Sequence, residues 1–320
     1  MKILEAPRGE EFTILNLTDP QLGDSEWDEG QPAGKLLTDT VTRLVEMTRP
    51  DLITVSGDIA WSANFVSYRR FTELMESFGL PWAPVLGNHD QEHGPEVTEK
   101  EIDVLLTGKN CLFERGDPKL GWGNYVLAVG FDGRPAHGII FMDSHSNVDY
   151  TPPGGQTYSA WAEIWPEQIE WYRDRIKELS ELGVRESSII THIPLYPFRD
   201  AVTAAYRPDV DLKAVPPRDG EQTGIWNPGY EDVSFGVMYE PVCSYPEDNG
   251  FFDVIRGLGS TKTFVCGHDH INTFSTVYRG VRLAYAVKTG SGCYWDERIN
   301  GGTVLKIAPS GRMTVKHIVL

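Results

Sequence analysis

Residues 79–90 read Gly-Leu-Pro-Trp-Ala-Pro-Val-Leu-Gly-Asn-His-Asp, and this stretch decides the fold class. Its central apolar run, Trp-Ala-Pro-Val-Leu, is short and bounded by turn residues, which is typical of a buried strand. The run leads directly into Asn88, His89 and Asp90. In open α/β sheets, ligands bind beyond the carboxyl ends of the strands. The stretch therefore predicts a parallel strand that carries polar side chains into a site.

The sequence before this strand alternates between strand and helix patterns. Short apolar runs at 12–18 and 52–56 predict strands, and apolar residues recur at helical spacing over 33–48 and 65–78. The order strand, helix, strand, helix, strand predicts a parallel sheet covered by helices. The second half continues this trend with further predicted elements. They are strands at 138–142, 188–191 and 264–266, a helix at 166–182, and antiparallel strands within 282–287 and 303–307.

One long segment, residues 197–249, has no clear periodicity and is rich in Pro, Gly, Asp and Tyr. A loop of this length in a compact protein is usually a functional lid or wall, or the sign of a missed element. Its aromatic side chains could line a pocket or hold the loop to the core. Arg199, within this segment, is a candidate contact for a phosphate group.

Charge and cysteine content exclude several classes of protein. Lys and Arg number 29 against 46 Asp and Glu, which gives a net charge of −17. Such a chain lacks the basic face that a duplex nucleic-acid surface needs, and it is repelled by anionic membranes. The four cysteines lie far apart with no C-x-x-C pair, so neither a disulfide framework nor a structural zinc knot is expected. The first residues show no signal peptide and no apolar run suits a membrane span, so we expect a cytoplasmic protein.

Polar residues follow five of the predicted strands, in an ordered set along the chain. A single such cluster is usually only a turn, but five at predicted strand ends are rarely produced by chance. Oxygen and imidazole donors gathered at one rim are what divalent metals require. The clusters are Asp19-Pro-Gln21, Gly57-Asp58, Gly87-Asn88-His89-Asp90, His192, and Gly267-His268-Asp269-His270.

This ordered set resembles the calcineurin-like metallophosphoesterase superfamily, and within it the purple-acid-phosphatase-related branch of plants, fungi and bacteria. The resemblance extends from about residue 12 to residue 308. It implies an α/β fold, a four-layer α/β/β/α sandwich of two mixed β-sheets flanked by helices. Because the clusters come from both halves of the chain, we expect residues 1–320 to form a single domain.

The resemblance also implies a site for two divalent metal ions, with manganese, iron or zinc as candidates. By this likeness one ion would be held by Asp19, Gln21, Asp58 and His270. The other would be held by Asp58, Asn88, His192 and His268, so that Asp58 bridges the two. No thiolate is involved, and the donors suit these metals. Two ions at such a site can hold a bridging hydroxide that attacks a phosphoryl group.

Two further residues are implied to act in catalysis. By the resemblance, His89 would face the leaving oxygen as proton donor or charge stabiliser. Asp90 could then accept the ring N–H of His89 and hold the imidazole in place.

Two positions depart from the family pattern. Most members carry His where this chain has Gln21, and an amide oxygen is a neutral and weaker donor than imidazole. We therefore predict looser and less zinc-selective binding at the Asp19 and Gln21 position. Purple acid phosphatases carry a metal-binding Tyr where this chain has Trp61, and Trp cannot bind a metal ion. The iron–tyrosinate colour and the ferric site that it marks are thus not expected.

The leading hypothesis is a dinuclear metal-dependent phosphoesterase, with phosphomonoesters slightly favoured over phosphodiesters. Its substrate would be a small molecule or a protein that carries a phosphate ester. A second hypothesis, from a different class, is a scaffold that keeps the fold but has lost catalysis. The motifs of P-loop NTPases, zincins and α/β-hydrolases are absent from the sequence.

Overall fold

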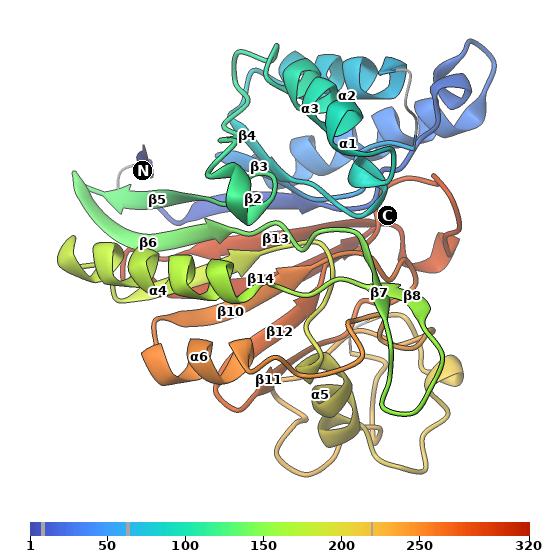
Figure 1. Ribbon diagram of the computed structural model, residues 1–320, viewed down its shortest axis with the longest axis vertical. Coiled ribbons are helices and arrows are strands. Elements are labelled where there is room, and N and C mark those ends of the chain that lie inside the picture. Colours follow the sequence, from blue (N-terminus) through green and yellow to red (C-terminus); the bar gives the residue numbers. More distant parts are fainter. Residues whose placement is uncertain (8–9, 62–64, 219) are drawn as a thin grey trace.

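The computed structural model describes residues 1–7, 10–61, 65–218 and 220–320. Two large β-sheets lie against each other, and helices cover the outer side of each (Figure 1). This confirms the expected fold class, an α/β/β/α sandwich of two mixed sheets. None of the helices in the described part of the chain is both long and apolar enough to cross a bilayer.

The first sheet contains the strands that were expected from the opening half of the sequence. Its strand order is β14-β13-β2-β3-β4, with β2, β3 and β4 parallel to one another and β13 antiparallel to both neighbours. The carboxyl ends of β2, β3 and β4 therefore lie at one edge. The strands are β2 (Phe12–Leu17), β3 (Leu52–Ser56), β4 (Trp82–Val85), β13 (Gly301–Ile307) and β14 (Met313–Val319).

The second sheet has seven strands in the order β1-β5-β6-β9-β10-β12-β11. Its central strands β6, β9, β10 and β12 are parallel. The strand expected as antiparallel within 282–287 is β12, which is antiparallel to β11 but parallel to β10. The strands are β1 (Lys2–Glu5), β5 (Tyr125–Phe131), β6 (Arg134–Phe141), β9 (Glu186–Ile190), β10 (Thr261–Cys266), β11 (Ser275–Tyr278) and β12 (Val281–Tyr285).

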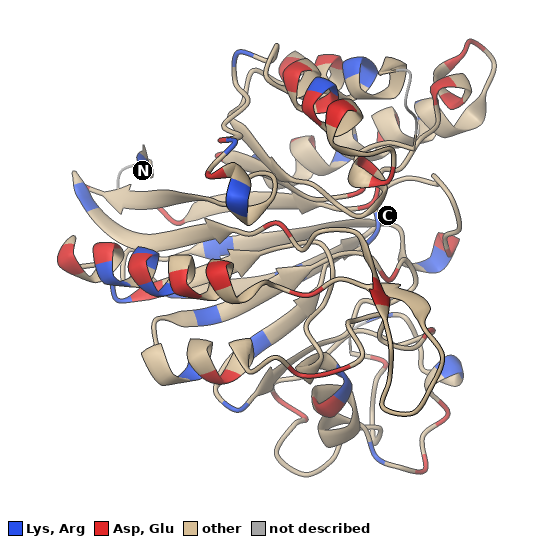
Figure 2. Ribbon diagram, in the orientation of Figure 1, with Lys and Arg blue, Asp and Glu red and all other residues tan. Residues whose placement is uncertain are grey.

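The helices form the two outer layers and carry many of the charged side chains (Figure 2). α1, α2 and α3 lie on the side of the five-stranded sheet, and α4 and α6 on the opposite side (Figure 1). α1 begins at a proline, which suits the first turn of a helix, and buries Leu37, Val41 and Leu44 at helical spacing. The helices are α1 (Pro32–Thr48), α2 (Val66–Ser77), α3 (Pro95–Leu105), α4 (Pro166–Glu181), α5 (Pro197–Ala205) and α6 (Phe251–Leu258).

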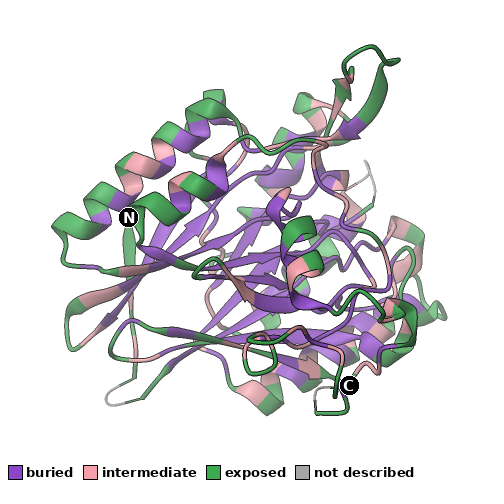
Figure 3. Cartoon of the chain, turned by 90° about the horizontal axis from the view of Figure 1, so that it is seen from below, coloured by how far each residue is buried: buried purple, intermediate pink, exposed green. Residues whose placement is uncertain are grey.

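Alternating side chains of the second sheet serve two separate cores, and the strands are accordingly buried (Figure 3). Leu127 and Val129 of β5 pack between the sheets, together with residues of β2 and β3. Val126 points the other way and packs with Tyr172 and Ile176 of α4. This period-two pattern fixes the register of the sheet, because a slip of one residue would exchange the two faces.

The segment 197–249 is less irregular than the sequence indicates. It opens with α5, which the sequence analysis missed, and residue 219 lies outside the described part. Tyr206 and Trp226 are buried and pack on each other and on Phe274, so they hold the segment to the core. A small hairpin of β7 (Asn147–Tyr150) and β8 (Tyr158–Trp161) also went unpredicted. The short 3-10 helices are η1 (Asp24–Trp27), η2 (His89–Gln91), η3 (Pro118–Leu120), η4 (Leu212–Ala214) and η5 (Glu297–Ile299).

Candidate metal centre

The polar clusters meet where the two sheets face each other, each directly after a strand. Asp19, Asp58 and Asn88 follow β2, β3 and β4 of the first sheet. His192 follows β9 of the second sheet, and the cluster from 267 to 270 follows β10. Parallel strands within each sheet place these ends at a common edge, which is where α/β folds bind ligands.

Two groups of acidic and histidine side chains share Asp58. Its carboxylate lies with His192 and His268 in one group, and with Asp19 and His270 in the other. Within each group the potential ligand atoms all lie within 4.8 Å of one another, and every residue is buried. Such compact sets of carboxylates and imidazoles are suited to divalent metal ions.

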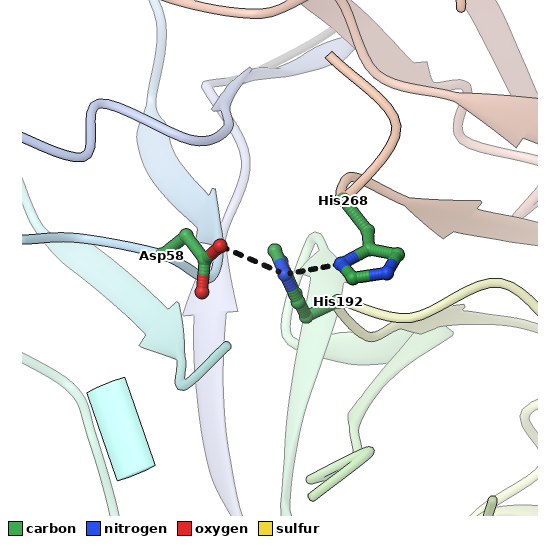
Figure 4. A group of neighbouring side chains, drawn as sticks. All are labelled: Asp58, His192 and His268. Carbon is green, nitrogen blue, oxygen red and sulfur yellow. Dashed lines mark hydrogen bonds and ion pairs between the residues drawn. The ribbon is translucent and has the colours of Figure 1, made fainter. Parts of the chain in front are cut away.

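His192 lies between the other two members of the first group (Figure 4). Its Nε2 is 3.3 Å from Oδ2 of Asp58, 3.2 Å from Nδ1 of His268 and 3.0 Å from Oδ1 of Asn88. Asn88 thus joins this group through its amide oxygen. Four potential donor atoms from four strand ends converge on one point.

The second group is built around Asp19. Its Oδ1 lies 3.3 Å from Nε2 of His270, while its Oδ2 accepts hydrogen bonds from the Thr18 hydroxyl and the His268 backbone N–H. One carboxylate oxygen is therefore held in place by the protein and the other faces the group. Gln21, two residues further along the chain, is also buried, with 1% of its surface exposed.

Several buried polar atoms of these residues lack hydrogen-bond partners within the described residues. They are Oδ1 of Asp19, both amide atoms of Gln21 and Nε2 of His268. An unpartnered buried polar group costs about 1–3 kcal/mol, so a concentration of them in one place needs an explanation. Metal ions coordinated by the two oxygens, Oδ1 of Asp19 and Oε1 of Gln21, would satisfy those atoms, and the residues present fit a two-metal site.

Backbone carbonyl groups fix the orientation of two of the imidazoles. Nδ1 of His192 lies 2.7 Å from the Ser56 oxygen, and Nδ1 of His270 lies 2.8 Å from the Tyr294 oxygen. Because these carbonyls accept a hydrogen bond from Nδ1–H, the neutral tautomer leaves the Nε2 lone pair free to bind a metal ion. Nε2 is the atom that faces the carboxylates in both residues.

Burial and charge shift the pKa values of these groups in opposite directions. Burial disfavours the charged His192 imidazole, but the carboxylates of Asp58 and Asp19 outweigh this and raise its pKa to about 10. Burial also lowers the pKa of His268, to about 3, and the neighbouring His192 charge adds to the effect. For Asp19, burial is outweighed by His270 and His192, and its pKa is lowered. Before a metal ion binds, the site thus combines charged and neutral side chains, and His192 must lose its Nε2 proton to become a ligand.

The backbone around the site is held in unusual conformations. Asp19, Gln21, Asp58 and His268 all have positive φ angles, between 45° and 77°, a region that non-glycine residues seldom adopt. Each such residue costs of the order of 1–3 kcal/mol, and such strain concentrates at functional sites. The surrounding sheets must therefore hold these four residues in place.

Two glycines allow the strand ends to approach one another. A Cβ at Gly87 would lie 2.1 Å from Oδ1 of Asp58, and one at Gly267 would lie 2.0 Å from the Thr18 hydroxyl oxygen. No side chain can be accommodated at such distances. The glycines that precede Asn88 and His268 are required by this close packing.

His89 lies beside the first group, with its backbone N–H donating to Oδ1 of Asp58 over 3.0 Å. Its ring is held by Glu92 rather than by Asp90, with 2.7 Å between Nδ1 and Oε2. The expectation that Asp90 orients this ring was wrong. Asp90 accepts instead from the Tyr68 hydroxyl and from backbone N–H groups of Ile59 and Gly87, so it fixes the loop.

The structure also places residues at the site that the sequence did not indicate. Lys288 is buried, and its Nζ donates to the main-chain oxygen of Asp19 over 2.6 Å. Trp161 lies edge-on to His268. Arg199, the candidate phosphate contact, is bonded within its own segment. Its guanidinium donates to the hydroxyl and carbonyl of Ser244 and lies over Tyr196.

Comparison with known proteins agrees with this geometry. The model of the calcineurin-like phosphoesterase family matches residues 12–215. The chain belongs to that family. By this membership it is a phosphoric ester hydrolase, and the branch suspected from the sequence is also confirmed by its relatives.

Two curated relatives illustrate the branch. Probable inactive purple acid phosphatase 14 of Arabidopsis thaliana is 29% identical over 321 residues, covering 90% of this chain and 74% of its own length. Phosphatase DCR2 of Saccharomyces cerevisiae is 24% identical over 92% of this chain and 50% of its own length. A dimetal phosphatase from Danio rerio shares the fold, with a TM-score of 0.57, 13% identity and coverage of 96% and 95% of the two chains.

Proposed function

We propose that this protein is a dinuclear metal-dependent phosphatase that hydrolyses phosphomonoesters. The observation that carries the proposal is the pair of buried acid and histidine groups that share Asp58, in one of which Oδ1 of Asp19 has no hydrogen-bond partner among the described residues. The ligands come from both halves of the chain, so we propose also that residues 1–320 act as one domain.

The proposed ligand sets are those that the resemblance implies, and the two groups that share Asp58 support them. Asp19, Gln21, Asp58 and His270 would hold one divalent ion, and Asp58, Asn88, His192 and His268 the other. The oxygen and imidazole donors suit manganese, iron(II) or zinc. Two ions bound there would polarise a phosphoryl group and lower the pKa of water between them.

His89 is the proposed proton donor to the leaving oxygen. Its backbone is tied to Asp58, which places the ring next to the first group, and Glu92 holds Nδ1. With Nδ1 occupied, Nε2 is the atom available to a substrate.

A phosphodiesterase is the second candidate, and one observation favours it. Arg199, the cation that the sequence indicated for a phosphate contact, is committed to Ser244. A phosphomonoester carries a second negative charge, for which an arginine is a common partner. A diester, with a single charge, needs that partner less.

The relative named as probable inactive raises the scaffold alternative. In this chain, however, all seven proposed ligand residues are present and buried at the same edge. Four of them have strained backbone angles. A scaffold would have no need to keep this arrangement, which favours catalysis.

A paired assay tests the proposal. Protein stripped of metal and refilled with manganese would be assayed on p-nitrophenyl phosphate and on bis-p-nitrophenyl phosphate. Asn88→Ala removes a proposed ligand, and Asn110→Ala is a matched control because its amide bonds Glu76 outside the site. We expect turnover that requires both metal and Asn88, and that is faster on the monoester.

The rate ratio separates the candidates. Faster turnover of the diester would replace the phosphatase proposal by the phosphodiesterase. An absence of metal-dependent turnover with manganese, iron or zinc on both esters would reject the enzymatic proposal in favour of the scaffold.

A further inference from the structure

Three histidines at the candidate metal centre each have an aromatic side chain packed against the imidazole ring. Trp61 stacks on His89, with ring centroids 4.7 Å apart and 22° between the planes. Tyr294 stacks on His270 at 4.2 Å and 23°. The third ring, that of Trp161, meets His268 edge-on at 4.3 Å.

Two of these rings are open to solvent. Trp61 is 43% exposed and Tyr294 is 46% exposed, although large aromatic side chains are usually buried. The loops that carry them both border residues 20–22: the Trp61 backbone N–H donates to the Leu22 oxygen, and a Cβ at Gly292 would lie 2.4 Å from the Gln21 oxygen. The mouth of a site for a charged phosphate group therefore carries two exposed ring surfaces.

These rings are not needed to orient the histidines. Glu92 already fixes the ring of His89, and the Tyr294 main-chain oxygen already fixes the ring of His270. Trp61 and the Tyr294 side chain add apolar surface without a hydrogen bond to either imidazole. Exposed aromatic surface at the mouth of a pocket is typical of ligand binding.

We propose that Trp61, Trp161 and Tyr294 form a subsite for a planar aromatic group on the alcohol side of the substrate ester. This rests on the proposed function and narrows its substrate class to aryl or nucleoside phosphate esters. Planar groups stack on such side chains with little loss of conformational freedom. The contact depends little on which aromatic ring the ligand carries.

Binding of phosphonates tests this subsite without any turnover, because their carbon–phosphorus bond resists hydrolysis. Phenylphosphonate and cyclohexylphosphonate are matched in size and charge, and only the first is planar. Calorimetry on the manganese-loaded protein would measure both dissociation constants. We expect the phenyl compound to bind about tenfold more tightly.

Variants then locate the preference. Trp61→Leu or Tyr294→Leu should reduce the preference for phenylphosphonate over cyclohexylphosphonate to less than about threefold. Trp61→Phe and Tyr294→Phe keep an aromatic ring and should retain this preference. Trp165→Leu is the matched control, because this exposed Trp stacks on His145, outside both groups. The 5′-phosphonate analogue of adenosine monophosphate distinguishes a nucleoside from a simple aryl group by binding more tightly than phenylphosphonate.

The outcomes separate this proposal from the proposed function. Equal binding of the phenyl and cyclohexyl compounds, or a preference that survives both leucine substitutions, would overturn the aromatic subsite while leaving a phosphoryl site intact. Failure of both phosphonates to bind the metal-loaded protein would reject the subsite and the proposed function together.

Discussion

Nδ1 of His89 and Oε2 of Glu92 lie 2.7 Å apart, with both side chains about three-quarters buried. The pair is separated by three positions across η2, and side chains at that spacing eclipse in a 3-10 helix. Glu92→Gln should lower turnover about tenfold or more, because the amide holds the ring without stabilising its charge. Initial rates on esters with poor leaving groups would measure this effect.

Metal content provides the control for this substitution. Glu92→Gln should leave two ions per chain, because Glu92 belongs to neither ligand group. Glu99→Gln, on the exposed surface of α3, should change neither rate nor metal content. Full turnover of Glu92→Gln on poor leaving groups would contradict the role assigned to the pair.

Glu92 also shows where sequence reasoning reaches its limit. The polar clusters could be placed at one edge because apolar runs predict strands, and parallel strands end together. The partner of His89 depends on the turn that follows the strand. Asp90, adjacent in sequence, accepts hydrogen bonds from Tyr68 and Gly87 instead. Glu92 reaches Nδ1 of His89 because the 3-10 turn brings the two side chains together.

The missed elements have a similar physical reason. The sequence did not predict α5 because this helix has only nine residues and opens a long segment rich in Pro and Gly. Tyr294 gave no signal, since it lies in a loop distant in sequence from His270, and its contact depends on how that loop returns to the site. Local patterns predict elements, whereas contacts between loops depend on the whole fold.

Gln21 should be a weak ligand, so that the metal ion it helps to hold binds less tightly than the other. Its amide atoms are buried and without partners in the described structure, but an amide oxygen is a neutral donor. Gln21→His should tighten zinc at one of the two positions by about tenfold or more, since imidazole is preferred by zinc. Competition against a chelator of known affinity would resolve two binding steps.

Gln21→Leu completes that comparison. It removes the donor while keeping a buried side chain, so one of the two steps should weaken and the other remain. If neither substitution altered either step, Gln21 would not be a ligand.

Stability should fall in acid partly because of His137, which lies away from the metal centre. It is fully buried between the Gly311 oxygen and the Ser188 hydroxyl, and burial lowers its pKa from 6.5 to about 4. Between pH 6.5 and 4 the unfolded chain binds a proton that the folded chain does not, so stability is complete above pH 6.5 and is lost as pH falls. The total loss is about 3 kcal/mol.

His137→Gln isolates this contribution. The variant should be less stable at neutral pH but should show a shallower loss of stability between pH 6.5 and 4. Urea unfolding with a chelator present would give the free energy of unfolding at each pH. Parallel curves for the two proteins would show that His137 does not carry this dependence.

Gly87→Ala should disable both metal positions at once. Its Cβ would stand 2.1 Å from Oδ1 and 2.4 Å from the backbone N of Asp58, the residue that both groups share. The backbone nitrogen cannot move without the strand end, and the carboxylate oxygen accepts from the His89 backbone N–H, so Asp58 must be displaced. We expect destabilisation of about 1–3 kcal/mol or more. We also expect metal stoichiometry to fall below one ion per chain.

Gly257→Ala is the matched control for that substitution. It lies in α6 with open space around the position of its Cβ, so the same chemical change should raise stability by up to about 1 kcal/mol through helix propensity. Calorimetry with metal analysis would measure both quantities for both proteins. Retention of two ions by Gly87→Ala would mean that the strand ends can separate, and that their close packing does not set the position of Asp58.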